Sequence, residues 1–192
     1  MRFKITLFAL LIVINISAQS TDDLKRDTKA LYNATYTMSF DTMLDFTYPL
    51  VFKFVERADM YGTLDSSFDN EVYRIRYQYT TPHFTYSDML MTDNGLYCVI
   101  SYENSILMTY KQPLSDDTRV KKITETLHKN FPDSIVRFEK ERNAFNIIKT
   151  DKLVAIFDDF TEGKWKFISF DPKYKELLDA VITEKIRNQL GL

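Results

Sequence analysis

The chain has few of the residues that interrupt or cross-link a fold. It contains four glycines, five prolines, one cysteine and two histidines among 192 residues. The low glycine and proline content excludes collagen-like and low-complexity chains. A single cysteine excludes an internal disulfide, and no histidine or cysteine pair has the spacing of a zinc site. We therefore predict a packed domain with no metal ion and no cofactor.

Recognisable catalytic motifs are also absent. There is no glycine-rich phosphate loop and no Gly-x-Ser-x-Gly nucleophile elbow. The single thiol, Cys98, lies in an apolar strand-like run, which indicates a buried small side chain rather than a nucleophile. His83 and Asp45 are the one acid–base pair that we consider, and nothing in the sequence places them together. The sequence therefore assigns no catalytic residue.

The first nineteen residues have the order of a secretory signal peptide. Arg2 and Lys4 precede an apolar run over residues 5–16, and small and polar residues follow up to Gln19. The apolar run is too short for a membrane anchor, which needs about 20 apolar residues. We expect residues 1–19 to be removed and residues 20–192 to form one domain without a transmembrane segment. The mature protein is then periplasmic or extracellular.

The charge balance is acidic. The formal net charge is −2, and loss of Arg2 and Lys4 lowers Lys+Arg from 25 to 23 against 27 acidic residues, which leaves −4. A nucleic-acid partner requires a basic surface, so the sequence predicts none. The same balance disfavours an anionic membrane surface.

Helical periodicity dominates the first part of the mature chain and returns twice later. Apolar residues recur at three- and four-residue spacings, and the period continues through Pro49, where we expect a kink or a fresh start. Ser115, Asp116 and Asp117 suit a helix N-terminus, and Asp171 with Pro172 suits another. The predicted helices cover residues 22–38, 41–54, 57–68, 116–130 and 172–190.

The period changes to two after residue 71. Along residues 72–79, polar side chains alternate with Tyr73, Ile75, Tyr77 and Tyr79, which is typical of a half-buried antiparallel strand. Asp93, Asn94 and Gly95 form a strong hairpin-turn signal. Further strands are predicted over residues 83–91, 96–102, 106–111, 135–140, 144–148, 153–158 and 165–170.

Helices segregated from antiparallel strands predict an α+β fold. The opening over residues 22–79 contains the run Asp41-Thr42-Met43-Leu44-Asp45-Phe46-Thr47-Tyr48-Pro49. It resembles the helical start of nuclear-transport-factor-like domains, which are cone-shaped relatives of the cystatin fold, and of small uncharacterised exported bacterial proteins. The resemblance covers about the first third of the mature chain. It implies N-terminal helices packed on a curved antiparallel sheet, to which the sequence adds an inserted helix and a C-terminal helix.

The inserted helix over residues 116–130 departs from the simple cone. It leaves open a second arrangement, in which the chain forms two halves and each half is a helix plus a four-stranded sheet. No linker rich in proline, serine or glycine separates the two strand sets.

The chain is rich in tyrosine, with 12 residues, and this is the compositional feature that says most about a binding site. Many fall on predicted strands, where ordinary β-propensity is the simpler explanation. A tyrosine combines an apolar ring with a polar tip, which suits a half-wet recess. We therefore name Tyr73, Tyr77, Tyr86 and Tyr97 as candidate ligand-binding residues.

The sequence favours a non-catalytic binding or protein-interaction module of the cell envelope. Its partner is an unidentified envelope protein or a small molecule. A small cone-fold hydrolase or isomerase is the first alternative, and a buried carboxylate beside His83 would favour it. An immunity or inhibitor protein is the second alternative.

Overall fold

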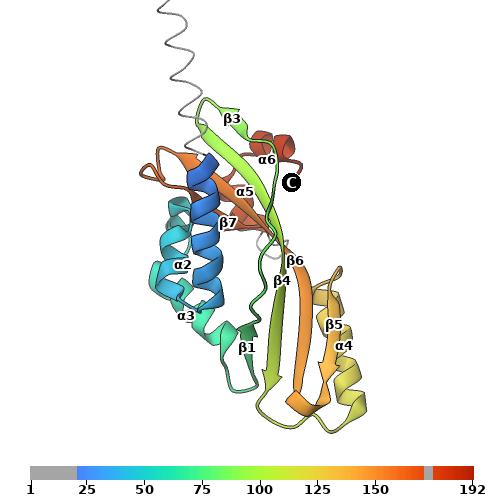
Figure 1. The fold of residues 1–192 in the computed structure, drawn as a ribbon. Coiled ribbons are helices and arrows are strands. Elements are labelled where there is room, and N and C mark those ends of the chain that lie inside the picture. Colours follow the sequence, from blue (N-terminus) through green and yellow to red (C-terminus); the bar gives the residue numbers. More distant parts are fainter. Residues whose placement is uncertain (1–20, 171–174) are drawn as a thin grey trace, which may run out of the picture.

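The computed structural model describes residues 21–170 and 175–192 (Figure 1). The predicted signal peptide and the predicted Asp171–Pro172 cap lie outside these residues. Besides an N-terminal helix that covers residues 21–36, the helices are α2 (Phe40–Phe46), η1 (Pro49–Lys53), α3 (Arg57–Phe68), α4 (Asp117–Asn130), η2 (Lys140–Arg142), α5 (Lys175–Val181) and α6 (Glu184–Leu190). The strands are β1 (Tyr73–Tyr77), β2 (Thr85–Tyr86), β3 (Leu90–Thr92), β4 (Gly95–Tyr110), β5 (Ile135–Glu139), β6 (Ala144–Asp158) and β7 (Lys166–Ser169).

The described strands form one seven-stranded sheet in which every strand pair is antiparallel, which confirms the predicted α+β class. Two long strands, β4 and β6, run side by side through the whole sheet, from the Gly95↔Asp158 pair to the Thr109↔Ala144 pair. At one end β2 and β3 flank β4, and β7 flanks β6. At the other end β1 flanks β4 and β5 flanks β6. We call these the helix-rich end and the α4 end (Figure 1).

The continuity of β4 and β6 corrects two predictions. We expected separate strands over residues 96–102 and 106–111, and over residues 144–148 and 153–158. Glu103, Asn104 and Thr150, which lie between the predicted strands, remain in the ladder. The alternative of two separate four-stranded sheets is also wrong, because the long strands pair one sequence half with the other.

The sheet narrows to two strands near its middle. The β1 pairing stops at Ile106 and the β2 pairing starts at Ser101, while the β5 pairing stops at Ile148 and the β7 pairing starts at Leu153. Residues 102–104 of β4 and 149–151 of β6 therefore pair only with each other. We call this two-stranded segment the waist.

Helices cover the sheet unevenly. We call the side that carries Ile100 and Ile106 of β4 face A, and the opposite side, which carries Tyr97 and Leu107, face B. At the helix-rich end the N-terminal helix packs on face A, and α5 and α6 pack on face B. At the α4 end, α4 packs on face A through Leu127. The core on face A includes Cys98 and Trp165, which are both fully buried, and the sequence predicts this burial for Cys98.

The helix boundaries follow local signals that the sequence contains. Pro49 ends the predicted second helix: α2 stops at Phe46, and η1 starts afresh at Pro49. Asp116 caps α4, because its Oδ1 accepts a 2.8 Å hydrogen bond from the Thr118 amide. The predicted C-terminal helix is two helices, since the chain breaks between Val181 and Glu184 and turns the buried Ile182 into the core.

Candidate functional site

The four candidate tyrosines do not share one site. Tyr73 and Tyr77 lie half-buried on β1 against the α4-end core, and Tyr86 lies on β2 against the core under the N-terminal helix. Tyr97 is buried on face B, in the core under α5 and α6. Tyr73 and Tyr77 thus pack against the same core but not against each other, and the binding role of all four stays a prediction.

Tyr77 belongs to a polar cluster at the waist that sequence reasoning did not find. Asn104 is 1% exposed, and its Nδ2 donates a 2.9 Å hydrogen bond to Oδ2 of Asp151. The other carboxylate oxygen of Asp151 pairs with Lys149. The negative charge of Asp151 acts on Tyr77 and Tyr102, although burial is the main reason that the pKa of each phenol is raised.

This cluster is incompletely satisfied within the described residues. The buried Oδ1 of Asn104 has no hydrogen-bond partner there, and neither does the buried Nε2 of Gln78, which follows Tyr77. A buried polar atom without a partner costs about 1–3 kcal/mol. On face A, the polar side chains of Asn104 and Asp151 lie at the waist, between the apolar core of the helix-rich end and that of the α4 end.

A recess of about 440 Å³ lies beside this region, between the N-terminal helix and the segment that leads from β1 to β2. This volume lies within the range of small-molecule sites. Tyr32, which is buried, supports its floor through edge-on ring contacts with Phe84 and Tyr102 at 5.8 and 5.7 Å. The residues that line the recess are Lys25, Lys29, Asn33, Tyr79, Thr81, Pro82, His83, Phe84 and Tyr86.

The helical spacing explains why three of these side chains converge. Lys25, Lys29 and Asn33 are four residues apart on a continuous helix, so they share one face. Across the recess, the hydroxyl of Tyr32 donates a 3.0 Å hydrogen bond to the carbonyl of Thr80 and fixes the opposite wall. The sequence shows that the two lysines share a helix face, but it does not show which segment of the chain packs opposite that face.

The recess is positively charged. No acidic residue lines it, and Lys25, Lys29 and His83 form no ion pair with any residue in the described ranges. The nearby acids Asp23 and Asp27 both pair with Arg26 instead. Two lysines beside aromatic rings suit a ligand that combines an anionic group with an apolar or planar part.

The acid–base pair considered from the sequence does not form. His83 lines the recess, whereas Asp45 lies on α2 and pairs with Arg57 at 2.8 Å. His83 has no hydrogen bond within the described residues that would orient it as a general base. Cys98 is buried, and burial raises the pKa of its thiol, which disfavours a nucleophilic role.

A second hollow of about 570 Å³ lies at the tip of the helix-rich end, around the β3–β4 turn. Its acids include Asp93, Asp158 and Asp159, but Asp158 already accepts a hydrogen bond from Tyr48. Over residues 21–170 and 175–192, no three histidine, cysteine or acidic side chains gather in a metal-binding arrangement. The first recess is therefore the better candidate site.

The comparisons with protein-family models and with curated proteins found no significant match. The resemblance to nuclear-transport-factor-like domains stays a prediction. None of the helices in the described part of the chain is both long enough and apolar enough to cross a membrane.

Proposed function

We propose that this chain is an exported, non-catalytic binding protein of the cell envelope, and that the recess beside the N-terminal helix is its ligand site. One observation carries the proposal. Two lysines without an acidic partner face an aromatic-lined hollow of about 440 Å³. Exposed lysines on a protein with a net charge of −2 are ordinarily balanced by nearby carboxylates, whereas Asp23 and Asp27 pair with Arg26, and Lys25 and Lys29 have no ion pair within the described residues.

The ligand is a small molecule with a carboxylate or phosphate group next to an apolar ring. Lys25 and Lys29 supply point charges for the anionic group, and Asn33 supplies an amide for hydrogen bonding. Tyr79, Phe84 and Tyr86 supply ring surface for the apolar part. His83 has no hydrogen bond within the described residues that would orient it as a base, and Cys98 is buried away from the recess, which favours binding without turnover.

The test uses 2-naphthoate as probe, with the neutral 2-naphthamide as its matched compound. Both are titrated into the isotope-labelled mature chain and followed by amide NMR shifts. We expect naphthoate to shift the amide signals of the N-terminal helix and of residues 79–86. Lys29→Ala should weaken its binding about tenfold, or about 1.4 kcal/mol.

Lys185→Ala is the control, because Lys185 is exposed on α6 and does not line the recess. It should leave the affinity unchanged, and 2-naphthamide should bind more weakly than naphthoate. Equal binding of both compounds, or shifts outside the recess, would refute the proposal. Turnover of small esters that His83→Ala abolishes would establish the enzyme alternative instead.

A further inference from the structure

The two faces of the sheet differ at the α4 end. Face A carries the core under α4, but residues of face B such as Leu107, Ile148 and Ile135 belong to none of the three core clusters. Ile135 is 49% exposed, and no described helix packs on this part of face B. We call this part of face B the open face.

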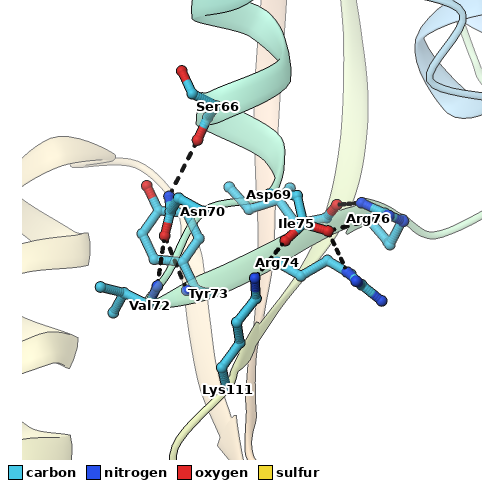
Figure 2. A network of polar contacts seen from close by, with 9 residues as sticks. All are labelled: Ser66, Asp69, Asn70, Val72, Tyr73, Arg74, Ile75, Arg76 and Lys111. Carbon is cyan, nitrogen blue, oxygen red and sulfur yellow. Dashed lines mark hydrogen bonds and ion pairs between the residues drawn. The ribbon is translucent and has the colours of Figure 1, made fainter.

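One corner of the open face carries a cluster of three cations around one carboxylate (Figure 2). Asp69 Oδ2 contacts Nε of Arg74 at 2.7 Å, and Asp69 Oδ1 contacts Nζ of Lys111 at 2.9 Å. Arg76 lies farther away, at 3.9 Å from the same carboxylate. Three positive charges therefore share the single carboxylate of Asp69.

The backbone holds this cluster in place. Asn70 Oδ1 accepts hydrogen bonds from the amides of Val72 and Tyr73 at 2.9 and 3.1 Å, and Asn70 Nδ2 donates to the Ser66 carbonyl (Figure 2). These contacts fix the turn between α3 and β1. Arg74 and Arg76 alternate with inward residues of β1, so both side chains are presented on the open face.

Another cation, Arg137, lies directly across the sheet from this corner. The strand register places Arg76, Leu107, Asn146 and Arg137 in one row across β1, β4, β6 and β5. Three strand spacings separate Arg76 from Arg137, or about 14 Å. Arg137 is exposed and has no ion pair or hydrogen bond within the described residues.

We propose that the open face docks an extended acidic segment of a protein partner, with two carboxylates on either side of an apolar residue. In an extended chain, side chains four residues apart point the same way and lie about 13 Å apart. This spacing matches the distance of about 14 Å across the sheet between the backbone positions of Arg76 and Arg137. The central apolar side chain then contacts Leu107, which lies between the two arginines.

A protein segment fits the open face better than a nucleic acid does. Glu103 and Glu139 also project from face B, on either side of the arginine row, and Glu139 pairs with Arg142 and accepts a hydrogen bond from Asn146. A polyphosphate carries charge at every residue and would meet both acids. A peptide can place carboxylates only where the arginines are. The proposal does not depend on the recess or on its ligand.

The probe is a capped pentapeptide with glutamate at both ends, valine in the centre and threonine between them. Its matched control has glutamine at both ends. Both are titrated at up to millimolar concentration into the isotope-labelled mature chain. We expect the glutamate peptide to shift amides of β1, β4, β5 and β6 at the α4 end, with an affinity that falls as salt rises.

The double variant Arg76→Ala plus Arg137→Ala should weaken binding about three- to fivefold, since exposed ion pairs contribute modestly. Both side chains are exposed, so the fold should persist. Arg119→Ala is the control, because Arg119 is exposed on α4, which covers face A. The proposal is overturned if the glutamate peptide causes no shifts on the open face, or if the double variant binds it equally well. Tighter binding of a single-stranded DNA oligonucleotide to the same face would also overturn it.

Discussion

The hydroxyl of Tyr48 donates a 2.6 Å hydrogen bond to Oδ2 of Asp158, 110 residues later in the chain. Tyr48 precedes η1, and Asp158 ends β6, so this bond ties the N-terminal helical segment to the tip of the long ribbon. The Tyr48 amide also donates to the Phe167 carbonyl of β7 at 2.9 Å. The chain after α2 is thus fixed along the edge of the sheet, and Tyr48 is buried in the face B core.

Tyr48→Phe should lower the free energy of unfolding by about 1.5 kcal/mol, because it removes a hydrogen bond to a charged acceptor and keeps the ring. Urea unfolding of both proteins measures the difference. Tyr61→Phe is the matched control, since Tyr61 is exposed, contacts the Phe40 ring, and has no hydrogen bond from its hydroxyl within the described residues. It should change stability by less than about 0.5 kcal/mol. Equal losses in the two variants would contradict the role of the Tyr48 bond.

Stability should fall steeply in alkaline solution. Burial raises the pKa of Tyr48, Tyr77, Tyr97 and Tyr102 above the usual value for tyrosine. A group with a raised folded pKa contributes stability that is fully present below its unfolded pKa, about 10, and that is lost as the pH rises above it. Tyrosinate absorbance should therefore show one set of tyrosines that ionises reversibly and another that ionises only as circular dichroism reports unfolding. Ionisation of all tyrosines with the fold intact would disprove this.

Two glycines should respond in opposite directions to alanine. Gly95 has φ +148°, and an added Cβ would lie 2.5 Å from the Phe157 carbonyl oxygen and 2.8 Å from Cβ of Asp158. Gly95→Ala should therefore cost more than about 2 kcal/mol. Gly62 lies in α3 with nothing within 4 Å of an added Cβ, so Gly62→Ala should stabilise the protein by about 0.5–1 kcal/mol. Thermal unfolding of both variants checks the two signs.

Residues 20–192 should unfold in one transition. The strands β4 and β6 extend through both ends of the sheet, so neither end keeps its central strands if the other unfolds. Scanning calorimetry of the mature chain should give equal calorimetric and van't Hoff enthalpies. Two resolved transitions would show that the waist separates independent units, and that the prediction of one domain is wrong.

Local signals made much of the fold predictable. The two-residue period identified β1, the turn residues before Gly95 placed the β3–β4 hairpin, and Pro49 and Asp116 marked helix boundaries. Each of these depends on the conformational preference of a few neighbouring residues. The predicted strand over residues 83–91 was less accurate, since only residues 85–86 and 90–91 of it lie in β2 and β3.

Long-range pairing was not predictable in the same way. Glu103, Asn104 and Ser105 have the composition of a turn, and only their pairing with β6 makes them strand residues. Asn104 resembles a surface residue in sequence, yet it is almost fully buried. The recess was missed for a similar reason. Lys25 and Lys29 define a helix face, but the aromatic wall opposite them comes from a segment about fifty residues later.

The waist has a mechanical consequence for the molecule. A ribbon of two strands twists and bends more easily than a sheet of four, because fewer hydrogen bonds resist the deformation. The polar cluster around Asp151 adds contacts at this point without the interlocked packing that stiffens the two ends. We therefore expect the chain to twist more readily at the waist than within either end, and such twisting would change the orientation of the recess relative to the open face.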